Sequence, residues 1–322
     1  MSCVGEPAFL LDFPFPEKET LSCFFPFFLR DFSVFSVFSV VSPYATCGSP
    51  VKYWIRHLRA VDSTQNHLRR LLDRGATPPH GMVILTDKQT RGRGRHNRRW
   101  LSPPGGLYFS LLLYANRAGA PGPSEALSPE ILPLLPLAIG AAAAEALDPR
   151  GESILIKWPN DLAARNRKLG GILVESDTRA AIAGVGINIE PVPLSSAISL
   201  AELFPGRTFE KRILLSKILD RFSHFLEEGP GAVTQSVNKR LYGRGVEAVH
   251  EGKTGFVREV LPNGALRLEG KNGDSCDIIS GEIFPRDWKG GNLPEEAECG
   301  PREALDVERS IETVEEKGAE RR

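Results

Sequence analysis

Lys157-Trp-Pro-Asn-Asp161 is followed, seven residues after Asp161, by Lys168 within Arg167-Lys-Leu-Gly-Gly171. Residues 154–156 before this segment and residues 171–175 after it are short apolar runs, which predict two strands. An amide, a carboxylate and two ammonium groups are therefore expected near strand ends, a common place for functional side chains. A lysine there can stabilise a phosphate, and a carboxylate can orient or deprotonate an amine. Taken alone, the pentapeptide is equally compatible with surface charge beside a Trp-Pro turn.

Residues 89–100 form a second informative segment, in which glycine alternates with arginine over Gly92-Arg-Gly-Arg95. Glycine lets the backbone approach a ligand closely, and arginine binds carboxylate or phosphate oxygens through two parallel hydrogen bonds. The segment predicts a loop that holds an anionic ligand. A solvated basic loop or an RNA-binding stretch would have the same composition.

A third segment, Gly184-Val-Gly186-Ile-Asn188, follows another predicted strand. It is too short for a dinucleotide-binding fingerprint and lacks the third glycine. It fits either a strand that ends beside a ligand or a simple bulge.

The rest of the chain between residues 52 and 285 predicts a mixture of strands and helices. Asp62 or Ser63 is suited to cap a helix that continues through Leu72. Further strands are predicted at 82–85, 107–113 and 180–186, and further helices at 131–147, 211–226 and 232–241. From residue 247, short strands separated by hairpin signals predict a small β module, with a barrel as the expected form.

Both ends of the chain differ from this body. Residues 1–50 hold ten of the seventeen phenylalanines, lack a basic start and are broken by proline and charge, which disfavours a secretory signal or a membrane span. We expect a disordered N-terminal extension outside the fold, with an over-extended start of the reading frame or a partner-binding or membrane-touching segment as the open alternatives. Residues 286–322 are polar and charged and predict a disordered tail.

The composition limits the class of protein further. The 322 residues contain 40 basic and 40 acidic side chains, and this zero net charge argues against a nucleic-acid partner. None of the five cysteines lies between residues 52 and 274, and no pair has metal-ligand spacing. No disulfide framework is expected, and a cytoplasmic location fits.

The segments gain specificity when they are taken together and in order. With Asp62-Ser-Thr64 at the start, they resemble the motif set of biotin protein ligases, from about Asp62 to about Ile283. The resemblance implies an α+β fold: a mixed β-sheet with packed helices, similar to the catalytic domain of class II aminoacyl-tRNA synthetases, over residues 51–242. It also implies a small SH3-like β-barrel over residues 243–285.

The resemblance further implies an ATP-dependent enzyme that forms biotinyl-5′-AMP and transfers biotin to a lysine of a biotin carboxyl carrier domain. ATP and biotin would be substrates, Mg²⁺ would accompany ATP, and the chain itself would provide no metal site. The expected form is a monomer or homodimer without a DNA-binding domain, acting in the cytoplasm without a membrane or nucleic-acid partner.

Fourteen residues are carried over by position from the family's motifs. The implied catalytic residues are Lys168, Asp161, Arg93 and Arg95. The implied biotin-binding residues are Ser63, Thr64, Gln65, Gln89, Arg93, Gly94, Arg95, Lys168 and Gly171. The implied nucleotide-binding residues are Arg93, Arg95, Trp100, Asn160, Lys168, Gly186 and Asn188. Either Gln65 or its neighbour Asn66 could present its amide to biotin.

Three other functions compete with this interpretation. A lipoate ligase or octanoyl transferase shares the catalytic fold, but the Gly-Arg-Gly-Arg loop, the Lys-Trp-Pro-Asn-Asp block and the C-terminal β module favour biotin. An RNA-binding protein could use residues 91–99 as a basic patch, and its binding would depend steeply on salt. A catalytically inactive biotin-binding regulator is disfavoured because the charged residues are in place and no recognition helix precedes Asp62.

Overall fold

The computed structural model of the chain describes residues 37–40, 51–115, 127–251, 253–286 and 288–289. The chain divides into two units, Met1–Ser36 and Val37–Arg322, and all described residues belong to the second. The predictions for residues 1–36 and 41–50, and for the tail beyond residue 289, lie outside the described residues. Within the described ranges, no helix is long and apolar enough to cross a lipid bilayer.

The larger sheet has eight strands in the order β1-β2-β3-β4-β8-β7-β6-β5. Its strands are β1 (Val37–Val40), β2 (Tyr53–Val61), β3 (Met82–Gln89), β4 (Leu107–Tyr114), β5 (Leu155–Lys157), β6 (Asp161–Ala164), β7 (Arg167–Ser176) and β8 (Ala180–Ile187). Strands β2 and β3 run parallel, and the other neighbouring pairs of these described strands run antiparallel. The predicted α+β class with a mixed sheet is confirmed.

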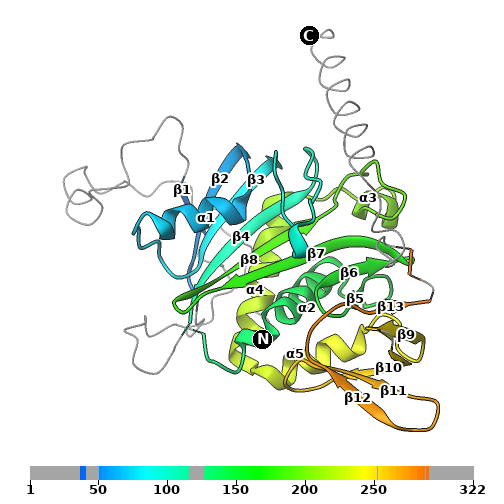
Figure 1. Cartoon of the computed structure of the whole chain (residues 1–322). Helices are drawn as coiled ribbons and strands as arrows, with labels where there is room; N and C mark the ends of the chain where they lie inside the picture. The colour runs from blue at the N-terminus through cyan, green and yellow to red at the C-terminus, as the bar shows by residue number, and fades with distance from the viewer. Residues whose placement is uncertain (1–36, 41–50, 116–126, 252, 287, 290–322) are drawn as a thin grey trace, which may run out of the picture. The chain divides into compact units, whose positions relative to one another are not determined.

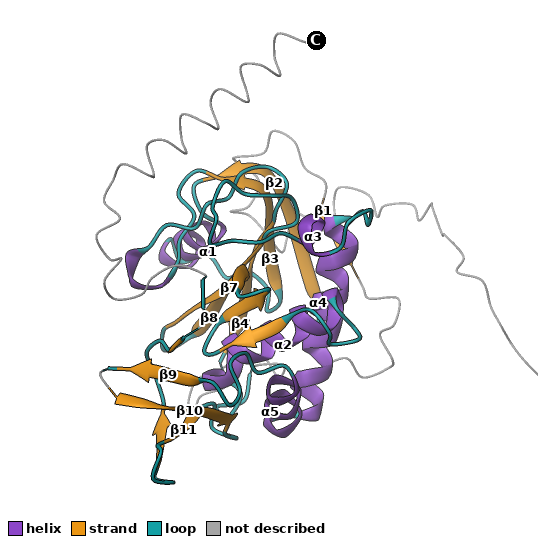
Figure 2. Ribbon diagram, turned by 90° about the vertical axis from the view of Figure 1, so that its right-hand side faces the viewer, coloured by secondary structure: helices purple, strands orange, loops and turns teal. Residues whose placement is uncertain are grey.

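Helices cover both faces of this sheet, as Figures 1 and 2 show. The helices are α1 (Thr64–Asp73), α2 (Leu135–Leu147), α3 (Leu200–Leu203), α4 (Lys211–Glu228) and α5 (Pro230–Lys239). Strand β3 illustrates why two layers form: Val83 and Leu85 join the core shared with α2 and α4, whereas Met82 and Ile84 join the core beneath α1. Alternating burial of this kind follows from the two-residue period of a strand.

The local sequence determines where the helices begin. Ser63 caps α1, and its hydroxyl accepts a 3.4 Å hydrogen bond from the backbone N–H of Asn66. The helix predicted from residue 131 starts with a short 3-10 turn, and α2 proper begins at Leu135 with Pro136 in its first turn. Proline is tolerated there because the first N–H groups of a helix have no partner within the helix.

A five-stranded antiparallel sheet, in the order β12-β11-β10-β9-β13, forms the C-terminal module. Its strands are β9 (Glu247–His250), β10 (Lys253–Val260), β11 (Leu266–Glu269), β12 (Ser275–Ile278) and β13 (Phe284–Pro285). The module is bonded to the larger domain through Trp158, whose Nε1 donates to the carbonyl of Gly264 at 2.9 Å, and through Asn238, whose side chain pairs with the backbone of Val260.

Two boundaries differ from the sequence expectation. Residues 37–40, expected outside the fold, pair with β2 as β1. Trp288, expected in the tail, is buried edge-on against Tyr242 with ring centroids 5.3 Å apart, so the folded chain continues past residue 285. Strands β2 and β6 and the short helix α3 were not predicted. In β2, the charges of Tyr53–Val61 interrupt the apolar pattern.

Candidate active site

A cavity of about 240 Å³ lies on the face of the larger sheet that carries α1. It is enclosed by the start of α1, the loop after β3, and the cavity-facing residues of β4, β6, β7 and β8. All fourteen residues predicted from the sequence line this one cavity: Ser63, Thr64, Gln65, Gln89, Arg93, Gly94, Arg95, Trp100, Asn160, Asp161, Lys168, Gly171, Gly186 and Asn188. Segments that are up to 125 residues apart, Ser63 to Asn188, are thereby brought together.

Two glycines of β8 make room for side chains to lie flat against the sheet. A Cβ at Gly184 would stand 2.7 Å from Oε1 of Gln65, and one at Gly186 would stand 2.4 Å from Nε1 of Trp100. Real Cβ atoms do not approach heavy atoms that closely, so a larger residue at position 186 would displace the Trp100 ring, and one at position 184 would displace the end of the Gln65 side chain. The Gly-x-Gly pattern therefore marks a strand that faces a site.

Buried and half-buried polar side chains form one wall of the cavity. Oε1 of Gln89 accepts hydrogen bonds from the backbone N–H of Thr64 at 2.9 Å and from its hydroxyl at 3.2 Å. The Thr64 hydroxyl also lies 2.7 Å from that of Ser110, which donates to Oε1 of Gln65 at 3.2 Å. Gln65 is 3% exposed and lines the cavity, whereas Asn66 does not. Of the two amides that the sequence left open, Gln65 is thus the one that lines the cavity.

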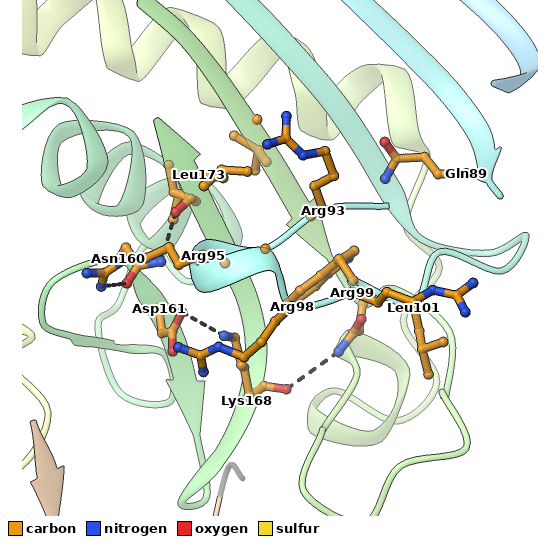
Figure 3. A pocket seen from close by; sticks show the side chains of 18 of the residues that line it. Gln89, Arg93, Arg95, Arg98, Arg99, Leu101, Asn160, Asp161, Lys168 and Leu173 are labelled. Carbon is orange, nitrogen blue, oxygen red and sulfur yellow. Dashed lines mark hydrogen bonds and ion pairs between the residues drawn. The ribbon is translucent and has the colours of Figure 1, made fainter. Parts of the chain in front are cut away.

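Lys168 and Asp161 form an ion pair inside the cavity, with Nζ 2.8 Å from Oδ1 (Figure 3). The two residues come from the neighbouring strands β7 and β6. The Lys168 ammonium also lies 5.4 Å from the centre of the Trp100 ring, within cation–π range. The Trp100 Nε1 is buried without a hydrogen-bond partner among the described residues, so an acceptor introduced by a ligand would relieve its desolvation.

The loop after β3 is tied to the C-terminal module by its arginines. The Arg95 guanidinium donates to Oδ1 of Asn160 at 3.1 Å and to the carbonyl of Gly281 at 3.2 Å. Arg98 pairs with the carboxylate of Glu282, which itself lines the cavity. The C-terminal module therefore contributes to the rim of the site.

Arg93 lies apart from the Asp161–Lys168 pair in Figure 3. Its guanidinium donates to both carboxylate oxygens of Glu175, at 2.7 and 3.0 Å, and to Oδ1 of Asn66 at 3.0 Å. The positive charge of Arg93 is thus already balanced by a carboxylate.

Two of the predicted groups have structural partners of their own. The Asn188 side chain is buried, and its Nδ2 donates to the carbonyl of Ile198 at 3.2 Å. Of the two lysines in the segment from Lys157 to Gly171, Lys168 lines the cavity and Lys157 does not. Lys157 is buried between the rings of Phe284 and Trp288, 5.5 and 5.0 Å from their centres, and burial lowers its pKa while Asp161 opposes that effect.

Three polar side chains in or beside this site were not predicted from the sequence: Ser110 and Glu282, which line the cavity, and Glu175, which bonds to two of its lining residues. Ser110 had a signal, since it is a polar residue within the otherwise apolar stretch of β4. Glu175 and Glu282 had none, because a carboxylate near a strand end gives no indication of its partner.

A comparison with protein-family models matches residues 58–191 to the biotin/lipoate A/B protein ligase family. The bifunctional ligase/repressor BirA of Salmonella typhimurium is 34% identical over 257 residues, covering 73% of this chain and 72% of that protein. The chain belongs to the biotin/lipoate A/B protein ligase family. The biotin--[acetyl-CoA-carboxylase] ligase of Mycobacterium tuberculosis, also a relative, is 32% identical over 244 residues, covering 71% of this chain and 88% of that protein.

A solved structure of similar fold supports the family assignment. The biotin protein ligase from Aquifex aeolicus in complex with biotin and ATP aligns with a TM-score of 0.59 and 31% sequence identity. The alignment covers 72% of this chain and 98% of that protein.

Proposed function

We propose that this chain is a biotin protein ligase, which activates biotin with ATP to biotinyl-5′-AMP and then transfers biotin to a lysine of a carrier domain. The observation that carries the proposal is the convergence of all fourteen motif residues on one cavity. Support comes from the similar fold of the Aquifex enzyme, which was solved with biotin and ATP.

The biotin head group fits the polar wall made by Ser63, Thr64, Gln65 and Gln89. A cyclic urea presents N–H donors and a carbonyl acceptor, and this wall offers the hydroxyl and amide groups of buried Ser63, Thr64 and Gln65 and of half-buried Gln89. Such groups discriminate strongly between ligands, because a ligand without matching polar atoms leaves them unpaired.

The first reaction takes place near Lys168. The carboxylate oxygen of biotin attacks the α-phosphorus of ATP, a P–O bond forms, and pyrophosphate leaves with its Mg²⁺. Two anions must meet, so fixed positive charge from Lys168 and Arg95 lowers the barrier. Trp100, Asn160, Gly186 and Asn188 form the nucleotide side of the cavity.

The second reaction uses Asp161. The carrier lysine attacks the acyl carbon of the mixed anhydride, and AMP leaves with the bonding electron pair. The attacking amine must lose its proton, and Asp161 is the carboxylate placed to orient it or accept that proton. The loop that carries Gly94 and Arg95 covers the adenylate and slows its hydrolysis until the carrier binds.

The proposed function also leads us to expect a particular domain arrangement, partner and location. We infer a catalytic domain over residues 51–242 of the class II aminoacyl-tRNA synthetase type and an SH3-like barrel over residues 243–285. The partner is a biotin carboxyl carrier domain of acetyl-CoA carboxylase or a related carboxylase. The chain acts in the cytoplasm as a monomer or homodimer, without a nucleic-acid or membrane partner.

The deciding experiment is incubation of the chain with ATP, Mg²⁺, labelled biotin and a carrier domain. Label should enter the carrier only when ATP is present, and a carrier whose acceptor lysine is changed to arginine should stay unlabelled. The alternative within the same family, a lipoate or octanoate ligase or transferase, predicts that lipoate raises the melting temperature and biotin does not.

A further inference from the structure

A continuous chain of hydrogen bonds runs along the polar wall and returns to the loop from which it starts. Nε2 of Gln89 donates to the hydroxyl of Ser102, at the end of the loop, at 2.8 Å. Gln89 is bonded to Thr64, Thr64 to Ser110, and Ser110 to Gln65, as described above.

Glu175 closes this chain. Nε2 of Gln65 donates to Oε2 of Glu175 at 3.1 Å, and the same carboxylate accepts two hydrogen bonds from Arg93, at the start of the loop. Both ends of the segment from Arg93 to Ser102 are therefore connected through the wall of the biotin pocket. Hydrogen bonds arranged in series polarise one another, so the state of one member affects the rest.

We propose that Glu175 is a positioning residue that couples the biotin pocket to the arginine loop by holding Gln65 and Arg93 together. The inference rests on the proposed function. Glu175 itself does not line the cavity, and its carboxylate accepts from the cavity-lining residues Gln65 and Arg93. It acts through those two side chains.

This arrangement gives Arg93 and Arg95 different roles. Arg93 is bound through two hydrogen bonds to a carboxylate, so its charge is balanced before any phosphate arrives. Arg95 makes no ion pair with the carboxylates of the described residues and donates instead to an amide oxygen and a carbonyl oxygen. Of the two arginines, Arg93 is accordingly the anchor of the loop, and Arg95 is the one assigned to the phosphate.

The test compares the wild-type chain with Glu175→Gln and with Asp277→Asn as a matched control. Asp277 makes a comparable two-bond pair with Arg267 on the C-terminal module, at 2.8 and 3.0 Å, and does not line the cavity. Pyrophosphate release is measured against biotin concentration at saturating ATP, and against ATP at saturating biotin. Trypsin cleavage after the arginines of residues 91–99 reports on the loop itself.

Glu175→Gln should raise the KM for biotin about tenfold, the effect of losing one charge-assisted hydrogen bond. The KM for ATP and the kcat should change by less than about threefold, since the groups facing the phosphate are untouched. The variant should be cut by trypsin in the loop faster than the wild type, even without ligand. Asp277→Asn should behave as the wild type in every measurement.

An unchanged KM for biotin, or a lowered kcat with unchanged KM, overturns the proposal. If Glu175→Gln does not fold, Arg93→Lys tests the other half of the pair: it keeps the charge, loses the two-bond geometry, and should show the same rise in KM. A wild-type chain that releases no pyrophosphate with biotin would reject the proposed function, while the ligand-free trypsin comparison would still decide whether Glu175 anchors the loop.

Discussion

Replacement of Lys168 by alanine is the sharpest test of the chemistry. Its ammonium is the cation nearest the candidate base, 2.8 Å from Oδ1 of Asp161, and it faces the Trp100 ring in the same cavity. A preorganised group that stabilises charge in a transition state contributes about 100- to 1,000-fold to the rate. The variant also leaves a carboxylate that is only 14% exposed without its partner, at a cost of about 1–2 kcal/mol in the free energy of unfolding. We therefore expect pyrophosphate release to fall by at least about 100-fold in a protein that is still folded.

The assay is ATP- and biotin-dependent pyrophosphate release, measured well below the unfolding temperature of each variant. Lys211→Ala is the matched control. The Lys211 side chain is 27% exposed, as is that of Lys168, and it pairs with Asp87 at 3.6 Å outside the cavity. It should retain the wild-type rate. Pyrophosphate release by Lys168→Ala within about threefold of the control would refute the role given to this ammonium.

Three further predictions address the cavity wall, the loop and pH. In Gly186→Ala the added Cβ should clash with Trp100, lower the free energy of unfolding in denaturant by about 1–3 kcal/mol and raise the KM for ATP. Gly231→Ala is the control, because no atom lies within 4 Å of its added Cβ, and it should change neither the stability nor the KM. Arg95→Ala should release labelled adenylate faster and so cause labelling of bystander lysines, because the contacts to Asn160 and Gly281 disappear. The control is Arg150→Ala, at an exposed position. A release rate equal to that of the control would contradict this prediction. Burial lowers the pKa of His67 from 6.5 to about 4. Between these two pH values His67 is protonated in the unfolded chain but not in the folded one, so the free energy of unfolding should fall as the pH drops from about 6.5 to 4. In His67→Gln that part of the pH dependence should be missing, and an identical pH profile of the melting temperature would count against the assignment.

The sequence predicted the parts of the molecule in which local pattern and tertiary structure agree. The apolar runs of β3, β4 and β8 and the capped helix α1 are examples, because burial on alternating or helical periods leaves a direct trace in the residues. Strand β2 was missed because it lies near the edge of the sheet, where half-exposed charged side chains are tolerated and blur the pattern.

At the site, the sequence predicted fourteen of the residues that line the cavity but not how they pair. The resemblance to family motifs places the charged residues together. It does not show whether Arg93 meets a phosphate or Glu175, because that depends on the register of β7 against β8 and on the side of the sheet that each residue faces. The same holds for Lys157, which sequence proximity places beside Asp161. Its side chain instead turns toward Phe284 and Trp288, more than 100 residues away in the chain.

The ion pair between Lys168 and Asp161 explains how one small cavity can serve two reactions of opposite demand. Adenylate formation needs a cation against the phosphate, and transfer needs a carboxylate that can accept a proton from an amine. While the two side chains remain paired, each is weakened for its task, since the charge of either is already balanced. Under the proposed function, we expect the anionic substrates to draw Lys168 toward the phosphate and free Asp161, so that the carboxylate becomes available only after the activated intermediate is in place. On this argument Asp161→Asn should slow transfer to the carrier much more than it slows pyrophosphate release, and equal losses in both steps would show that the pair acts as a single structural unit.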